Sequence, residues 1–133
     1  MKSRIIELTN EELADILSFV NASGYFELNY NREDWMQLAD SQKTEDPCFE
    51  DKLADLLIAG KTITLTDYDA EGDVYADGKL DEYDNGVYTL CLEDFFEWGD
   101  AHLAYEIIEG DGDAYTAHMF IQKVMFHGEV IYG

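Results

Sequence analysis

The residues that could carry chemistry are concentrated in one acidic stretch, DYDAEGDVYADGKLDEYDNG, which spans residues 67–86. The stretch contains eight acidic side chains and a single base, Lys79. It begins like a helix–loop–helix calcium loop, with oxygen ligands at the first, third and fifth positions and a glycine at the sixth: Asp67, Asp69, Glu71 and Gly72. The twelfth position, where such a loop needs a bidentate glutamate, is Gly78. We therefore expect weak cation binding here but no specific metal site.

A second candidate for chemistry is a histidine–carboxylate pair. His102 and Glu106 are four residues apart in a segment that we expect to be helical, so their side chains share one face. Such a pair could hold a metal or transfer protons, although the same spacing is typical of ordinary exposed pairs on helices. His118 and His127 lie in an apolar segment without the HExxH or cysteine-pair spacing of a zinc site, and we expect core or surface histidines. The sequence predicts no metal and no cofactor.

Motifs of the common enzyme classes are absent from the sequence. There is no GxSxG segment and no phosphate-binding glycine loop. The segment EGDGD, residues 109–113, has glycines, but its acids would repel a phosphate. An enzyme acting on an anionic substrate is therefore disfavoured. We favour a protein without catalytic activity, and keep a small enzyme that uses His102 and Glu106 as the alternative.

The formal net charge is -22, from 30 acids and 8 bases, and it is unevenly distributed. The segment from Asp67 to Asp113 holds sixteen acids against one lysine. Such a chain is repelled by nucleic-acid phosphates and by anionic membranes, whereas it attracts basic protein surfaces. Solubility of a small domain needs a net charge of only about 2–8 in magnitude, so the excess charge calls for a use.

Three uses of this charge compete. Dense carboxylates can imitate nucleic-acid phosphates, which supply about one charge per 1.7 Å of duplex axis. Adaptation to high salt is disfavoured because lysine outnumbers arginine six to two and aromatic residues are abundant. An ordinary acidic domain with a basic partner is the third use. We predict a small acidic interaction protein that engages a basic protein surface, with a nucleic-acid mimic or inhibitor from a phage or mobile element as its particular form.

The predicted interaction surface consists of the acids in the stretch and in the segment that follows it. They are Asp67, Asp69, Glu71, Asp73, Asp77, Asp81, Glu82, Asp84, Glu93, Asp94 and Glu97. Four tyrosines are interleaved with these acids: Tyr68, Tyr75, Tyr83 and Tyr88. They indicate either a hairpin with its tyrosines on the packed face or a surface on which rings lie between carboxylates.

The remaining sequence features concern the compartment. Cys48 and Cys91 are the only cysteines, too few for a disulfide scaffold, and we expect Cys91 to be a buried free thiol. No apolar run has the length of a signal peptide core or of a membrane helix. We therefore expect a cytoplasmic protein.

Hydrophobic periodicity predicts one α+β domain over residues 1–133, with a mostly antiparallel sheet of four or five strands and helices packed on one face. The spacing of apolar residues and of capping residues predicts helices over residues 10–21, 31–42, 47–60, 93–108 and 114–128, with Gly99 as a possible break. Alternating or β-branched runs predict strands over residues 4–8, 25–30, 61–69, 74–76, 86–92 and 129–133.

Overall fold

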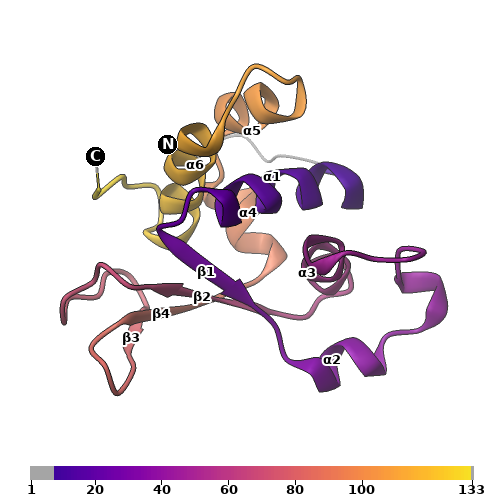
Figure 1. Ribbon diagram of the computed structural model, residues 1–133, viewed down its shortest axis with the longest axis horizontal. Helices are drawn as coiled ribbons and strands as arrows, with labels where there is room; N and C mark the ends of the chain where they lie inside the picture. The colour runs from indigo at the N-terminus through magenta and orange to yellow at the C-terminus, as the bar shows by residue number, and fades with distance from the viewer. Residues whose placement is uncertain (1–7, 133) are drawn as a thin grey trace.

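The computed structural model describes residues 8–132 and contains an antiparallel sheet with helices packed against it, so the α+β prediction is confirmed (Figure 1). The sheet has the order β1-β2-β4-β3, from β1 (Phe26–Asn29), β2 (Ile63–Asp67), β3 (Lys79–Leu80) and β4 (Gly86–Leu90). The helices are α1 (Asn10–Ala22), α2 (Arg32–Gln37), η1 (Asp40–Gln42), α3 (Phe49–Ile58), α4 (Leu92–Trp98), α5 (Ala101–Ile108) and α6 (Ala114–Met125). The predicted strand over residues 4–8 lies outside the described residues, apart from Leu8.

One face of the sheet is buried beneath the helices. Leu28, Leu65 and Tyr88 are register partners on three neighbouring strands, and each is at most 2% exposed. The opposite face carries the alternate residues, which are exposed or half-buried: Glu27, Thr66, Val87 and Lys79 form one row across all four strands. This alternation follows from the period of two in a β-strand.

Helix α1 begins where the sequence places it. The amide of Glu12 donates to Thr9 Oγ1 (3.1 Å) and the amide of Thr9 donates to Glu12 Oε1 (2.9 Å), which confirms the predicted capping box. The buried stripe of α1 packs against α3, α5 and α6. The first and the last described helix therefore meet in one core.

Two predicted helices are each divided. Residues 31–42 form α2 and then η1, because Leu38 adopts an extended conformation and turns its side chain into the core (7% exposed). Residues 93–108 form α4 and α5, with the break at Gly99, where a Cβ would lie 2.3 Å from the carbonyl oxygen of Phe95. Asp100 then caps α5 by accepting a hydrogen bond from the amide of Leu103 (3.0 Å).

Two predicted strands are wrong. Residues 74–76 form no strand because the amide of Tyr75 donates to a side chain, the hydroxyl of Tyr88, and the short strand lies instead at β3. Residues 129–132 form no strand because the side chain of Gln122 bonds the backbone of Ile131 and Tyr132. The helix predicted over residues 114–128 is confirmed as α6, which ends at Met125.

Candidate interaction surface

Six exposed acids lie on the two loops that join β2 to β3 and β3 to β4. They are Asp69, Glu71, Asp73, Asp77, Glu82 and Asp84, and we call this group the acidic tip. In Figure 1 the two loops project from the end of the sheet that lies away from α2 and α3. They are tied to each other by a hydrogen bond from the amide of Gly72 to the carbonyl oxygen of Asp84 (3.0 Å).

The first loop of the tip is held by the buried ring of Tyr88. The hydroxyl of Tyr88 accepts a hydrogen bond from the amide of Tyr75 (3.1 Å), and a turn follows in which the amide of Gly78 donates to the carbonyl oxygen of Tyr75 (3.0 Å). A Cβ at Gly78 would lie only 2.4 Å from Tyr88 Cε2, so the backbone packs directly on the ring. The ring in turn meets Phe126 edge-on, at 5.6 Å between centroids. The acids on this loop therefore project from backbone that is held in place by the buried ring of Tyr88.

The second loop is organised by Asp81. Its carboxylate accepts hydrogen bonds from the amides of Tyr83 and Asn85 (2.9 Å each) and from Asn85 Nδ2 (3.2 Å). The hydrogen bond from the Asn85 amide holds the pKa of Asp81 below its ordinary value, although desolvation opposes this effect. Asp81 is half-buried and shapes the turn, so its carboxylate is less available than those of the six tip acids.

Asp67 does not belong to the surface, and its prediction as a surface residue was wrong. It is 1% exposed, accepts a hydrogen bond from the hydroxyl of Tyr132 (2.7 Å) at Oδ2 and one from the amide of Asp69 (3.0 Å) at Oδ1. Burial raises the pKa of Asp67. The signal was present in the sequence, because Asp67 has the same phase in β2 as the buried Ile63 and Leu65.

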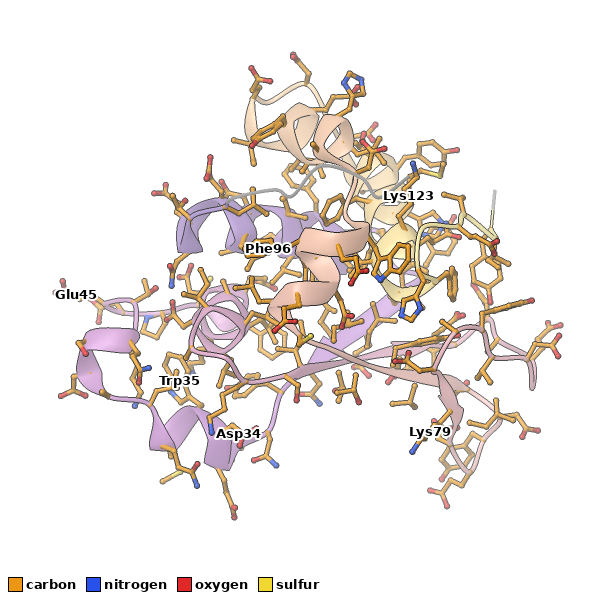
Figure 2. The ribbon with its side chains drawn as sticks, turned by 180° about the vertical axis from the view of Figure 1, so that it is seen from behind. Asp34, Trp35, Glu45, Lys79, Phe96 and Lys123 are labelled. Carbon is orange, nitrogen blue, oxygen red and sulfur yellow. The ribbon has the colours of Figure 1, made fainter. Side chains whose placement is uncertain are left out.

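The other predicted acids lie apart from the tip. Glu93, Asp94 and Glu97 are on α4, which follows the opposite end of β4, and Figure 2 shows Phe96 of α4 well separated from Lys79 of β3. Asp94 accepts a hydrogen bond from the amide of Cys91 (2.9 Å) and one from its thiol (3.4 Å). Cys91 is half-buried rather than buried, and desolvation raises the pKa of its thiol.

Further acids of the acidic region, between residues 109 and 113, lie between α5 and α6, above the sheet in Figure 1. The acids that are continuous in the sequence are therefore divided among three places in the fold.

Three basic side chains of the described residues are engaged away from the tip, whereas Lys79 lies on β3, between the two tip loops. Lys43 and Lys52 lie over the ring of Trp35, at 5.1 and 5.7 Å from its centroid, and Lys123 pairs with Asp100 (2.9 Å). Within residues 8–132, none of the six tip carboxylates forms an ion pair or a side-chain hydrogen bond. Their charge is therefore available to a partner.

Three tyrosine rings are exposed beside these acids. Tyr83 is 77% exposed, Tyr68 is 52% exposed and Tyr75 is 37% exposed, whereas Tyr88 is buried. The hydroxyl of Tyr68 donates to Glu27 on β1, which raises the pKa of the tyrosine. The tip thus combines one tyrosine on the packed face with three rings among carboxylates.

The histidine–carboxylate pair is formed but exposed. His102 Nε2 lies 2.8 Å from Glu106 Oε1, one turn apart on α5, in a hollow of about 590 Å³ that is also lined by Tyr105, Glu109 and Asp111. The side chain of His102 is 83% exposed, so the surrounding protein does not shield it from water. Among residues 8–132 no group of three or more histidine, cysteine or acidic side chains is placed to hold a metal ion.

A buried polar cluster around His118 was not anticipated. Gln122 Oε1 accepts from the amides of Ile131 (2.8 Å) and Tyr132 (2.7 Å), which fixes the orientation of its amide group. Gln122 Nε2 therefore donates to His118 Nε2 (3.2 Å) and to the carbonyl oxygen of Tyr132 (3.0 Å). The proton of His118 must then lie on Nδ1, which is buried without a hydrogen-bond partner. Burial lowers the pKa of His118, although Asp67 opposes this effect.

Comparison of the chain with known proteins adds no information about its function. No known protein family, no curated protein and no solved structure matches the chain. Within the described residues, no helix combines the length and the apolar character that crossing a bilayer requires. Function is therefore inferred from the chemistry of the acidic tip itself.

Proposed function

We propose that this protein binds a basic protein surface through the acidic tip, and that it does so as a mimic of nucleic-acid phosphates. The observation that carries the proposal is that all six exposed tip carboxylates, within the described residues, lack an ion pair and a side-chain hydrogen bond. Like charges held together repel one another, and a surface of lysine and arginine side chains would relieve that repulsion.

Two further features support a recognition role. Tyr88 and Asp81 support the loops, so the carboxylates need little ordering when a partner binds. The exposed rings of Tyr68 and Tyr83 offer flat surfaces on which arginine side chains can stack. Carboxylates with rings between them suit a groove that otherwise holds phosphates and bases, so the expected partner is a nucleic-acid-binding protein.

The proposal is tested with two variants of equal net charge. The tip variant carries Asp73→Asn, Asp77→Asn and Glu82→Gln, and the matched control carries Glu93→Gln, Glu109→Gln and Asp111→Asn on exposed positions elsewhere. Each immobilised protein is exposed to a bacterial lysate at low salt, and the affinity of every recovered partner is then measured against salt concentration and against competing duplex DNA. We expect the tip variant to lose affinity and salt dependence, and the control to keep both.

Each outcome bears on a separate part of the proposal. Equal losses in both variants would mean that net charge alone attracts partners and that the tip has no special role. Binding that persists in excess DNA would contradict the mimicry of nucleic acid but would still support binding to a basic protein surface. If the parent chain recovers no basic protein, both the mimicry and the binding of a basic surface are contradicted.

A small enzyme remains the alternative function, and the convergence of His102, Glu106 and Tyr105 in one hollow is the observation in its favour. Open access of water to the pair weighs against it, because catalytic acid–base groups work best where the site excludes water. The test is a panel of hydrolase substrates with the parent chain and with His102→Gln. Turnover that the substitution abolishes would favour the enzyme.

A further inference from the structure

The outer edge of β1 is a second surface, distinct from the acidic tip. The strand order β1-β2-β4-β3 leaves one edge of β1 without a neighbouring strand in residues 8–132, and Figure 1 shows β1 at one border of the sheet. A groove of about 420 Å³ follows this edge, lined by Asn21, Gly24, Phe26, Glu27, Leu28, Phe49 and Tyr68.

Exposed sheet edges are usually protected, because their free amides and carbonyls pair with other chains. The common devices are a very short edge strand, a charged side chain or proline on it, a β-bulge, or a covering element, and β1 has the first and, in Glu27, a charge. The strand FELN has neither lysine nor proline, and its register with β2 is regular from Phe26 to Asn29. The edge is short, and within residues 8–132 no strand pairs with it.

We propose that β1 binds an extended, basic segment of a partner protein, which adds to the sheet as a fifth strand. This inference does not depend on the function of the acidic tip. In strand addition, main-chain hydrogen bonds supply affinity and alternate side chains supply specificity. The two faces of β1 therefore determine which residues the added strand carries.

The two faces of β1 favour different side chains on the added strand. Glu27 and Asn29 are exposed on the open face, so residues of the added strand on this side meet the carboxylate of Glu27. Phe26 and Leu28 face the helices, and Phe49, which is 39% exposed, lines the same groove. A segment that alternates basic and apolar residues fits both faces, with its basic residues beside Glu27 and its apolar residues beside Phe49.

Charge favours a basic segment over a second copy of this chain as the strand that pairs with β1. A second copy of this chain would bring another net charge of -22 and a second Glu27 to the same edge. Pairing of like charges across neighbouring strands is unfavourable, whereas a basic segment is attracted. Tyr68, which lines the groove, precedes Asp69 of the tip in the sequence, and Glu27 supplies a carboxylate within the groove.

The test uses a ten-residue peptide of alternating lysine and valine, with the full chain followed by NMR. We expect chemical-shift changes and slowed amide exchange in Phe26–Asn29, and no binding of the matching glutamate–valine peptide. Methylating the backbone nitrogens of only the lysines or only the valines separates strand addition from simple charge attraction. In a strand, all residues of one set direct their amides to the same side, so one methylated peptide should lose roughly tenfold or more in affinity and the other should not.

A charge reversal on the protein completes the experiment. Glu27→Lys should weaken the lysine–valine peptide by roughly tenfold, whereas the control Glu45→Lys, on an exposed loop, should have little effect. The tip variant with Asp73→Asn, Asp77→Asn and Glu82→Gln should still bind the peptide with shifts in β1, which separates this surface from the tip.

Three results would overturn the inference. They are equal binding of the two methylated peptides, shift changes confined to the tip, and a dimer of the chain alone that protects the β1 amides.

Discussion

Replacing Gly78 with alanine should destabilise the protein through a contact with one aromatic ring. The added Cβ would lie 2.4 Å from Cε2 and 2.6 Å from Cζ of Tyr88, whereas carbon atoms pack at about 3.5–4.0 Å. The ring has little room to retreat, since it is 1% exposed and packs edge-on against Phe126. Overpacking of this kind costs about 1–3 kcal/mol. A displaced hydroxyl would also lose the hydrogen bond from the Tyr75 amide, worth about 1 kcal/mol. We therefore expect a loss of about 3 kcal/mol in the free energy of unfolding.

A second glycine of the same loop provides the control. Gly72 has a φ of +87°, and no atom lies within 4 Å of the position that an added Cβ would take, so Gly72→Ala meets only backbone strain of about 1 kcal/mol. The two alanine variants thus separate a steric effect from a conformational one. Urea unfolding followed by circular dichroism and tryptophan fluorescence measures both.

A double-mutant cycle tests the mechanism directly. Tyr88→Leu removes the ring atoms that a Cβ at Gly78 would meet, so Gly78→Ala should cost less than about 1 kcal/mol in that background. If Gly78→Ala costs no more than Gly72→Ala, or costs the same with and without the ring, the packing of the loop on Tyr88 is not what requires glycine.

Three further predictions concern charge and buried polar groups. Raising sodium chloride from about 0.01 to about 0.15 M should raise the melting temperature, by about 4 °C for each kcal/mol of relieved repulsion, and the tip variant should show a smaller rise in calorimetry. Because the folded pKa of His118 is lowered, the unfolded chain takes up the proton first as the pH falls below about 6.5, so stability should fall there by up to about 1.4 kcal/mol per pH unit. The difference between the parent and His118→Gln in urea unfolding at about pH 7 and about pH 5.5 isolates this effect, and parallel curves would contradict it. Asp55→Ala should cost about 3 kcal/mol, because its buried carboxylate accepts hydrogen bonds from Asn10 Nδ2 (2.7 Å), the Thr44 amide (2.7 Å) and the Thr44 hydroxyl (2.9 Å), whereas the exposed Asp15→Ala should change stability by less than about 0.5 kcal/mol.

Local signals in the sequence were sufficient for most elements of the fold. The capping box at Thr9 and the apolar stripe that follows it specify α1, because both depend only on neighbours within one or two turns. The alternation of β2 likewise specifies which of its residues are buried, and it would have placed Asp67 inside had it been applied to the acid as well. The errors arise where a distant side chain replaces backbone pairing. Tyr88 bonds the segment predicted as a strand at residues 74–76, and nothing near that segment in the sequence indicates it.

The candidate site was predictable only in part for the same reason. Charge density identified the six tip acids, whose exposure follows from their place on loops. The separation of Glu93 and Asp94 from the tip depends on the direction of β4, which is a property of the sheet rather than of the charge pattern. The cluster of His118 and Gln122 depends on the path of residues 131 and 132 back across α6, which no spacing rule predicts.

The contact between α1 and α6 has a consequence for how the chain acquires its structure during synthesis. Residues of α1 leave the ribosome well before α6, yet part of their apolar face is covered only by α6, whose last residue is Met125. Contacts between such distant segments form slowly, because a long loop must close before they contribute stability. Until α6 emerges, the buried stripe of α1 lacks part of its eventual cover. Part of the apolar face of α1 therefore stays uncovered while the whole sheet and five further helical segments are being made, and cooperative folding awaits α6.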